Sequence, residues 1–347
     1  MIRVLIVDDS KMHRAALSMI ISRAAGFELV GVAEDGEQGV ELVHRLKPAI
    51  VLMDVNMPRL DGLGATERIM AEKPTPILLM TASENLTGEV DLAYRAIEAG
   101  ALELIPKPAA LQPEDKATQD LLVRLKLLAG VPVISHVRGR RAPKRENLRR
   151  STSSIIRRAR RVIAVASSTG GPRALNQFLS GLPAELGAAV VLVQHIDGMF
   201  VDGFVRWLAE DKPIPVSVGE DGRGVHENEV IVAPAGSHME IGSDRRIVLK
   251  PGTDGSAHVP SGDRLLRSVG LTYGPRAVGV VLAGMREHGA RGLLAIKEAG
   301  GITFAQDEAT SVVYGMPRAA KLLGAAQSVL PLGELAAAVT RACRGTA

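Results

Sequence analysis

Short apolar runs alternate with segments of helical period over the first 130 residues. The runs are four or five residues long and rich in Val, Ile, Leu and Met, which is typical of buried strands. They lie at Val4–Val7, Leu29–Ala33, Ile50–Met53, Ile77–Met80 and Leu102–Ile105. Stretches with helical spacing follow them, such as Met12–Ala24 and Gly36–Leu46. Five βα units of this kind predict a parallel sheet with helices on both faces.

The same alternation returns in the second half of the chain. Apolar runs at Val162–Ala166, Ala188–Val193 and Ala277–Ala283 read as strands, and Pro172–Leu179 reads as a helix. We therefore expect an α/β protein with two doubly wound parallel-sheet domains. Functional sites in such sheets lie at the carboxyl ends of the strands, so the candidate chemistry is sought there.

A strongly basic segment separates the two halves. Between Arg138 and Arg161 there are eleven Arg or Lys residues and one acid, Glu146, a local net charge of +10. The total is +4, which leaves −6 for the rest of the chain. A segment so charged and so poor in apolar residues cannot bury enough surface to fold alone. We expect a first domain at 1–130, a basic linker at 131–160 and a second domain at 161–347.

The composition is that of a soluble globular protein, with 46% hydrophobic and 23% charged residues. The longest apolar runs fall far short of the ~20 residues that a membrane span needs. The start, MIRVLIVDD, has no basic region or cleavage site of a secretory signal. The single cysteine, Cys343, leaves no internal disulfide. We expect a cytoplasmic protein without membrane insertion.

Polar residues follow the strands of the first domain. Asp8 and Asp9 end the first strand, Asp54 the third and Thr81 the fourth, and Lys107 follows the fifth. Three carboxylates at one sheet edge repel one another unless a cation neutralises them, and an all-oxygen cluster suits Mg²⁺. Asp54 could then attack a phosphoryl donor, with Thr81 and Lys107 binding the new phosphate. One such acid alone would be a helix N-cap, but five residues at strand ends favour a site.

The segments VLIVDDS, VLMDVNMPRLDG, LLMTAS and LIPKP closely resemble the response-regulator receiver family over residues 1–130. The resemblance implies a flavodoxin-like fold, a histidine kinase as phosphodonor and Asp54 as phosphoacceptor. It also implies a magnesium site made of Asp8, Asp9, Asp54 and the backbone carbonyl of Asn56. One departure is Leu104, which stands where receivers often carry an aromatic residue that reports phosphorylation.

The second domain carries a serine at a strand-to-helix turn. Val162–Ala166 runs into SSTGGP, so Ser168 precedes a helix whose free N–H groups would stabilise an oxyanion. Such a turn would equally bind phosphate or simply cap the helix. His195 ends the next strand, in VVLVQHIDGMF, where it could act as a general base toward Ser168. A lone histidine there would more often be structural, but the pair favours catalysis.

Longer segments resemble the chemotaxis protein-glutamate methylesterase family over residues 160–345. They are ASSTGGP, QHIDGMF, VIVAPAGSHM, GVVLAGMREHGARG and FAQDEATSVVYGMPRAA, in the family's order. The resemblance implies a Rossmann-like fold and hydrolysis of glutamate methyl esters on chemoreceptor cytoplasmic domains. Deamidation of receptor glutamines and gating by the unphosphorylated receiver are also implied. Ser168 would be the nucleophile and His195 the base, with Thr169 and Met285 at the oxyanion.

The sequence departs from this family at the third catalytic position. The family usually reads TGMGxDGA, and its aspartate orients the histidine, whereas this chain reads AGMREHGA. Ala283 replaces the threonine, Arg286 the glycine and His288 the aspartate. Because His288 supplies no negative charge, the expected cost is large: loss of the acid from a serine-protease triad lowers turnover about 10⁴-fold. Glu287 is adjacent but would need the loop to shift by one residue.

Three functions from different classes therefore remain open. An active, phosphorylation-gated esterase ranks first, using Glu287 or another acid. A degenerate domain that binds a receptor without turnover ranks close behind. A DNA-binding regulator, suggested only by the basic linker, ranks a distant third because no helix-turn-helix pattern is present. His238 and Asp263 lie in family-like stretches without an evident chemical role, and Asp307 either approaches the site or caps a helix.

Overall fold

The computed structural model describes residues 1–81, 86–108, 112, 114–133, 157–210, 212–253 and 259–345. The chain divides into two compact units between Ala142 and Pro143. The greater part of the expected linker, 134–156, lies outside the described residues.

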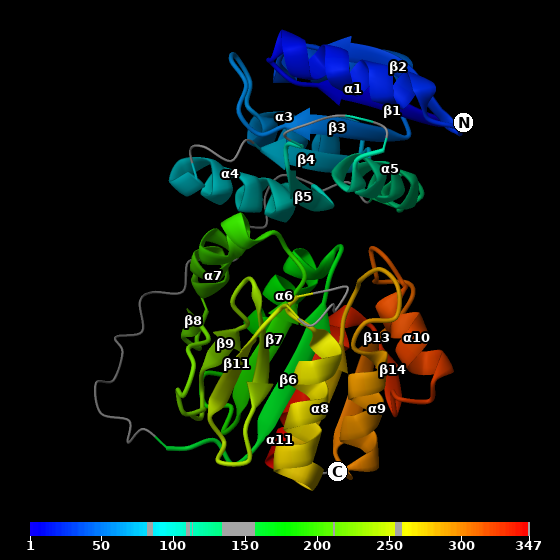
Figure 1. Cartoon of the computed structure of the whole chain (residues 1–347). Coiled ribbons are helices and arrows are strands. Elements are labelled where there is room, and N and C mark those ends of the chain that lie inside the picture. The colour runs from blue at the N-terminus through cyan, green and yellow to red at the C-terminus, as the bar shows by residue number, and fades with distance from the viewer. Residues whose placement is uncertain are drawn as a thin grey trace. The chain divides into compact units, whose positions relative to one another are not determined.

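The first unit is a five-stranded parallel sheet flanked by helices (Figure 1). Its elements in chain order are β1 (Ile2–Val7), α1 (Lys11–Arg23), β2 (Phe27–Ala33), α2 (Gly36–Leu46), β3 (Ile50–Asp54), α3 (Gly62–Glu72), β4 (Ile77–Thr81), α4 (Leu86–Ala99), β5 (Glu103–Pro106) and α5 (Lys116–Leu128). The strand order is β2-β1-β3-β4-β5, and helices α2, α3 and α4 pack in sequence. The doubly wound sheet expected from the sequence is confirmed.

Burial explains why these strands read as continuous apolar runs. Every residue of β3 and β4 is buried, because helices cover both faces of the sheet. Side chains of β1, β3 and β4 form one core with α2 and α3. Polar residues interrupt this pattern only where the strands end, at Asp54 and Thr81.

The second unit is a seven-stranded parallel sheet with a small antiparallel hairpin. Its elements are β6 (Val162–Ser167), α6 (Gly171–Ser180), β7 (Ala189–Gln194), η1 (Gly198–Phe200), α7 (Val201–Ala209), β8 (Val216–Val218), β9 (Val230–Val232), β10 (Ser237–Ile241), β11 (Ile247–Pro251), α8 (Gly262–Tyr273), η2 (Gly274–Arg276), β12 (Ala277–Val281), α9 (Ala290–Glu298), β13 (Ile302–Gln306), α10 (Met316–Leu322), β14 (Ser328–Leu330) and α11 (Leu332–Arg344). The sheet order is β14-β13-β12-β6-β7-β9-β8, and β10 pairs with β11.

Helices cover this sheet in two groups. Helices α8, α9 and α10 pack in sequence, while α6 packs against α11 (Figure 1). The central strand β6 is fully buried and pairs with β7 on one side and β12 on the other. This order brings the loops after β6, β7 and β12 to one edge of the sheet.

The second unit begins inside the expected linker. The N–H of Ala159 donates to the Val225 carbonyl at 3.0 Å, and Ala159 is buried in the core. Arg158 forms an antiparallel bridge with His226. Residues 157–160 therefore belong to the second domain, which starts before the expected boundary at 161.

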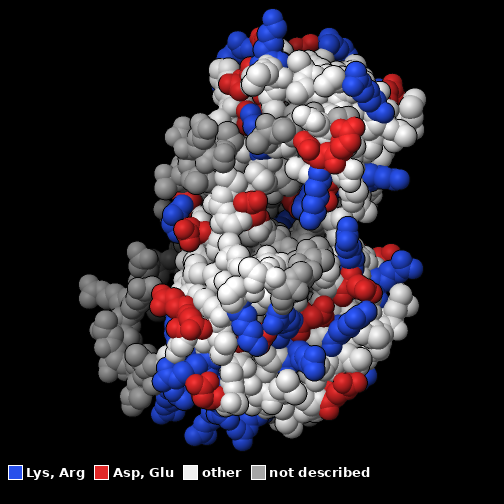
Figure 2. Space-filling view, in the orientation of Figure 1, with Lys and Arg blue, Asp and Glu red and all other residues white. Residues whose placement is uncertain are grey.

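Surface charge on the described residues is mixed. Acidic and basic side chains are interspersed over the visible face (Figure 2), as is usual for a solvated surface. Among the described residues, none of the helices combines the length and the apolar character that a membrane span requires.

Candidate functional site

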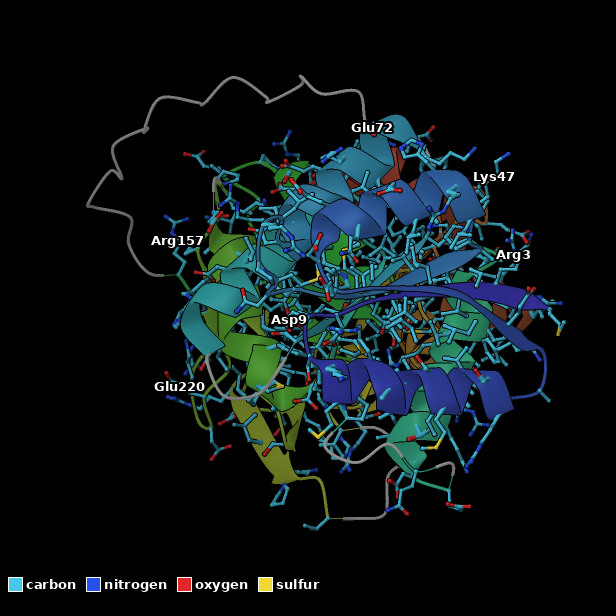
Figure 3. The ribbon with its side chains drawn as sticks, turned by 90° about the horizontal axis from the view of Figure 1, so that it is seen from above. Arg3, Asp9, Lys47, Glu72, Arg157 and Glu220 are labelled. Carbon is cyan, nitrogen blue, oxygen red and sulfur yellow. The ribbon has the colours of Figure 1, made fainter. Side chains whose placement is uncertain are left out.

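The first site lies at the carboxyl edge of the five-stranded sheet. Asp9, just beyond β1, lies at the end of the sheet opposite to Arg3 and Lys47 (Figure 3). Lys107, just after β5, reaches across β4 to the acids. Its Nζ donates to Asp54 Oδ2 at 2.6 Å and lies 3.0 Å from Asp8 Oδ2. The structure therefore joins the ends of β1, β3 and β5 through one ammonium group.

Three carboxylates form the centre of this site. One oxygen from each of Asp8, Asp9 and Asp54 lies within 4.8 Å of the others. Asp8 and Asp54 are buried, whereas Asp9 is exposed. Burial raises the pKa of Asp54 to about 6, with Lys107 opposing the rise and the charges of Asp8 and Asp9 adding to it. A compact all-oxygen cluster of this kind fits a hard divalent cation such as Mg²⁺.

His13 is a member of this site that the sequence did not reveal. It lies on the first turn of α1, and its Nδ1 is 2.6 Å from Asp8 Oδ2. Burial acts to raise the pKa of Asp8, but the contacts with His13 and Lys107 outweigh it and hold that pKa below its ordinary value. Arg14 adds two bonds, from Nη1 to the carbonyls of Asp8 and Asp9 at 2.7 and 2.8 Å. These contacts fix the turn that carries both acids.

The remaining expected members of the first site occupy the same edge. Thr81 ends β4 and is fully buried, and its carbonyl accepts from the Lys107 N–H at 2.8 Å. Asn56 lies two residues beyond Asp54 and is exposed. Leu104 is half-buried in β5. Gly62 packs close to the acid, since a Cβ there would lie 2.5 Å from the Asp54 carbonyl oxygen.

The second site lies at the carboxyl edge of the seven-stranded sheet. Ser168 follows β6, and its N–H donates to the Ala283 carbonyl beyond β12 at 3.0 Å. His195 follows β7, and its N–H donates to the Ser167 carbonyl at 3.1 Å. Gly284 lies directly against the serine, because a Cβ on Gly284 would be 2.9 Å from Ser168 Cβ. Three adjacent strands thus present the serine, the histidine and the third loop together.

Two glycines and one glutamine stabilise the turn at 168–170, which carries Ser168 between β6 and α6. Gly170 has φ of 77°, in the left-handed region that favours glycine. A Cβ on Gly171 would lie 2.1 Å from Gln194 Oε1. That oxygen accepts from Ser167 Oγ at 2.7 Å, while Gln194 Nε2 donates to the carbonyls of Ser168 and His195 at 2.9 and 3.1 Å. Gln194 therefore links the backbone of Ser168 to that of His195, a role that no motif in the sequence indicated.

The ring of His195 is oriented by a backbone carbonyl. Its Nε2 lies 3.0 Å from the Pro260 oxygen. A carbonyl only accepts, so Nε2 carries the proton and Nδ1 is the basic nitrogen of the neutral ring. Thr169 is buried and Met285 half-buried beside this pair.

His288 occupies the position beside His195. The two rings meet edge to face, with centroids 5.5 Å apart and planes at 76°. Burial lowers the pKa of His288, and Arg286 lowers it further, while Asp263 and Glu287 oppose the shift. His288 is thus favoured in the neutral form. Glu287 itself is exposed and lies 3.8 Å from Arg291.

The other substitutions in this loop differ in their effect. Ala283 is buried, and its N–H donates to Gln306 Oε1 at 2.9 Å. Arg286 has φ of 62°, which suits the glycine that the family resemblance implies at this position. Its backbone packs on Gly315, where a Cβ would lie 2.8 Å from the Arg286 nitrogen. The arginine side chain is exposed at the edge of the site.

The three weaker candidates have structural places. His238 is fully buried, and its Nδ1 accepts from the Ser261 N–H at 3.1 Å, next to the Pro260 carbonyl. Asp263 lies on the first turn of α8. Asp307 Oδ1 accepts from the Thr310 N–H at 3.0 Å and so closes a turn after β13.

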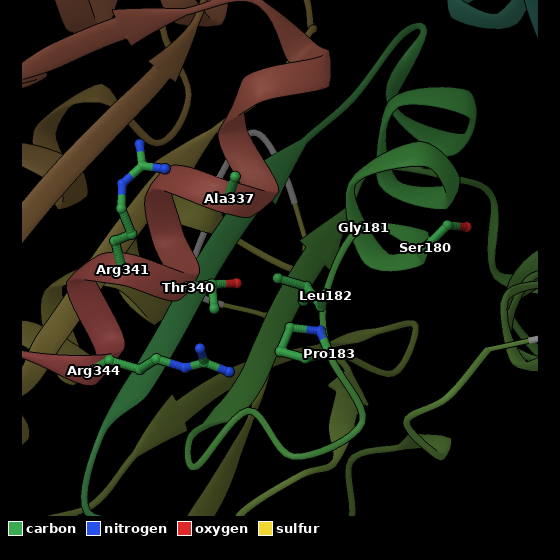
Figure 4. A pocket seen from close by; sticks show the side chains of 8 residues that line it. All are labelled: Ser180, Gly181, Leu182, Pro183, Ala337, Thr340, Arg341 and Arg344. Atoms are coloured by element: carbon green, nitrogen blue, oxygen red, sulfur yellow. The ribbon is translucent and has the colours of Figure 1, made fainter.

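A groove of about 460 Å³ lies elsewhere, between the last residues of α6 and helix α11 (Figure 4). Thr340, Arg341 and Arg344 line it from α11. Helix α6 starts at the serine turn and runs for 10 residues, so the groove lies ~15 Å away at the far end. It is not part of either site.

Comparisons with known proteins match both halves of the chain to known families. Residues 4–116 match the response regulator receiver domain, and residues 163–339 match the CheB methylesterase family. A protein-glutamate methylesterase/protein-glutamine glutaminase of Anaeromyxobacter dehalogenans is 40% identical over 99% of this chain and 97% of its own length. A counterpart of the same description from Syntrophus aciditrophicus is 41% identical over 97% of each. The CheB methylesterase catalytic domain of Thermotoga maritima matches with a TM-score of 0.51 and 29% identity, covering 52% of this chain and 97% of that domain.

Proposed function

This chain belongs to the CheB methylesterase family of ester hydrolases, with a response-regulator receiver domain in front, and from that premise we propose that Ser168 and His195 hydrolyse protein glutamate methyl esters. The observation that carries the proposal is the placement of the two residues directly after the adjacent parallel strands β6 and β7. The proposed substrate is the methylated cytoplasmic domain of a chemoreceptor, which places the protein in the cytoplasm.

The proposed reaction follows from the tautomer of His195. Ser168 Oγ adds to the ester carbonyl and gives its proton to Nδ1, the nitrogen that is not bonded to Pro260. The backbone N–H groups of Thr169 and Met285 donate hydrogen bonds to the oxyanion that forms from the ester carbonyl. His195 gives this proton to the departing methoxide, which leaves as methanol, and the glutamyl group stays on Ser168 Oγ as an ester. Water then gives a proton to His195 and adds to that ester, and the proton passes to Ser168 Oγ as the free glutamate leaves. A glutamine side chain would follow the same course with ammonia as the leaving group, as the relatives' second designation indicates for them.

The proposed turnover is slow, because no carboxylate occupies the third position. The Pro260 carbonyl orients His195 but carries no charge to stabilise the imidazolium. Neutral His288, edge-on at 5.5 Å, does not replace that charge by itself. The serine-protease precedent, about 10⁴ in turnover, includes the loss of the correct tautomer, which the Pro260 carbonyl preserves here, so 10⁴ is the upper limit of the cost.

The first domain supports a phosphorylation switch on this activity. Asp54 is the proposed phosphoacceptor and a histidine kinase the proposed donor. Bound Mg²⁺, held by Asp8, Asp9, Asp54 and the Asn56 carbonyl, would supply positive charge for the incoming phosphoryl oxygens. Lys107 would pair with the phosphate and Thr81 would hydrogen-bond it. Phosphorylation would relieve inhibition by the unphosphorylated receiver domain.

Methanol release tests the proposal. The full chain is incubated with a methylated receptor fragment, with and without acetyl phosphate and Mg²⁺. We expect slow release that rises with the phosphodonor and is lost in Ser168→Ala. Ser180→Ala is the matched control, since this exposed serine lies at the other end of the helix that follows Ser168. Equal release by the Ser168→Ala variant would contradict the proposal.

A receptor-binding module without turnover is the second candidate function. It is favoured by one observation, the imidazole of His288 at the place of the family's acid. If no variant releases methanol while the chain binds the receptor fragment in a phosphodonor-dependent manner, this second function replaces the first.

A further inference from the structure

One peptide group of the second domain contacts two histidines. The group joins Pro260 to Ser261, just before α8 begins at Gly262. Its carbonyl oxygen, on Pro260, accepts from His195 Nε2 at 3.0 Å. Its N–H, on Ser261, donates to His238 Nδ1 at 3.1 Å. Two histidines that are far apart along the chain therefore bind the two ends of a single amide.

The second of these histidines is buried and its strand is anchored. His238 lies in β10, and its side chain is fully excluded from solvent. On the same strand, Glu240 Oε1 accepts from Arg264 Nε at 2.8 Å. The Ile241 N–H donates to Ser268 Oγ at 2.9 Å. These bonds fix β10 along α8, so His238 is held in place against the residues that precede that helix.

The peptide group can pass an effect from one histidine to the other. Its C–N bond has partial double-bond character, so a hydrogen bond donated by the N–H draws electron density onto the carbonyl oxygen. Hydrogen bonds in such a chain strengthen one another, and they are stronger where water is excluded. Pro260 is buried, as His238 is. The Pro260 oxygen is therefore a better acceptor for His195 than an isolated carbonyl, most of all when His195 is protonated.

We propose that His238 is a positioning residue for ester hydrolysis, which acts on His195 through the peptide group between Pro260 and Ser261. By accepting from the Ser261 N–H, His238 fixes the direction of the Pro260 carbonyl. This keeps the proton of neutral His195 on Nε2 and leaves Nδ1 as the basic nitrogen. By polarising the same carbonyl, His238 supplies part of the negative charge that the missing acid would offer to the His195 imidazolium. This inference rests on the proposed methylesterase function.

A purely structural role for His238 is separable by substitution. His238→Asn keeps an acceptor, because the asparagine oxygen is bonded to Cγ as Nδ1 is in histidine. His238→Gln places its amide one bond further out and removes that acceptor, and His238→Leu removes every polar atom. The matched control is Glu240→Met on the same strand. It removes the bond to Arg264 and leaves the peptide group between Pro260 and Ser261 untouched.

The experiment measures methanol release by the full chain with acetyl phosphate and Mg²⁺, together with the ¹⁵N NMR signals of the His195 ring. Those signals are assigned by their loss in His195→Gln. For His238→Leu and His238→Gln we expect kcat to fall about tenfold at unchanged KM, because a misplaced base slows the chemical step and not substrate binding. In both variants the His195 ring should become a mixture of its two neutral tautomers.

The conservative variant and the control should behave differently. His238→Asn should keep kcat and the His195 tautomer close to wild type, since its oxygen can accept from the Ser261 N–H. Glu240→Met should lower the melting temperature and leave kcat unchanged. If His238→Leu does not fold, the comparison of His238→Asn with His238→Gln decides the inference.

The outcomes separate this inference from the proposed function. Wild-type kcat in folded His238→Leu or in His238→Gln would overturn it. An equal loss of kcat in His238→Asn and His238→Gln, or a similar loss in Glu240→Met, would reduce His238 to a structural anchor. If no variant releases methanol, the methylesterase proposal fails, and the NMR signals still decide the inference: an unchanged His195 tautomer in His238→Gln overturns it.

Discussion

The ring of His288 stands edge-on to the ring of His195, with 5.5 Å between the centroids. An imidazole there cannot give the charge stabilisation of a carboxylate, and two protonated rings at this distance would repel. Burial keeps the pKa of His288 below its ordinary value, so the repulsion is avoided at neutral pH. Below that pKa both rings compete for protons, and we expect any turnover to fall more steeply with decreasing pH than in a His288→Asp variant. A pH–rate profile of kcat checks this, and parallel profiles would contradict it.

Gly171→Ala tests whether Gln194 positions Ser168 and His195 through its hydrogen bonds to their carbonyls. A Cβ would lie 2.1 Å from Gln194 Oε1 and 2.9 Å from Ser167 Cβ, so Gln194 has to move. Because Gln194 holds the carbonyls of Ser168 and His195, we expect at least a tenfold loss of kcat and ~1–3 kcal/mol of stability. Gly187→Ala is the control, since no atom lies within 4 Å of a Cβ there. Because Gly187 has a positive φ of 68°, its replacement by alanine should lower stability somewhat, but it should leave kcat unchanged.

Asp54→Asn tests the phosphoacceptor. Acetyl phosphate with Mg²⁺ should add one phosphoryl group to the wild type and none to this variant, as measured by intact-protein mass spectrometry. Asp61→Asn is the matched control, because Asp61 caps α3 through a bond from the Gly64 N–H that asparagine can also accept. Undiminished labelling of Asp54→Asn would contradict the assignment of Asp54 as the phosphoacceptor.

The same variant tests the electrostatics of the metal-free site. Asp54 has a folded-state pKa of about 6 against an ordinary 3.8, so its ionisation destabilises the fold. The penalty is absent below pH 3.8, grows as the pH rises and is complete above about 6, where it amounts to at most about 3 kcal/mol. In EDTA at pH 8, Asp54→Asn should therefore unfold at higher urea concentration than wild type. The difference should shrink as the pH falls from 7 to 5, and a less stable variant at pH 8 would contradict the account.

A further prediction concerns the basic segment at 138–150, which lies outside the described residues. Between Arg138 and Arg150 the sequence carries seven Arg or Lys residues and few apolar ones. We expect trypsin to cut there first and to leave two stable fragments, one for each domain. Resistance of this segment while the domains are digested would contradict the expected linker.

Much of the fold was predictable because its signals are local. The buried strands β3 and β4 read as apolar runs, and the first helical residues follow turn residues such as Asp61 and Gly170. The carboxyl ends of parallel strands meet at one edge, so Asp8, Asp54 and Lys107 could be grouped before the structure was known. Their contacts within 3.0 Å follow that grouping.

The orienting groups could not be predicted, because they depend on long-range contacts. The partner of His195 Nε2 is a backbone carbonyl 65 residues away, which no side-chain pattern reveals. His238 Nδ1 accepts from the Ser261 N–H, 23 residues away, and the burial of the His238 side chain depends on tertiary packing. Asp263 had no evident role in the sequence, because the bond that its carboxylate accepts from the Gly292 N–H joins two helices that are far apart along the chain.

Replacement of His288 by aspartate tests the central claim most directly. Methanol release from a methylated receptor fragment is compared between wild type and His288→Asp, both with acetyl phosphate and Mg²⁺. The account predicts slow wild-type release that Ser168→Ala abolishes, and a rise in His288→Asp that approaches the ~10⁴ of the protease precedent only if Arg286 and Ala283 leave the site open. Rapid wild-type release that His288→Asp leaves unchanged would contradict it.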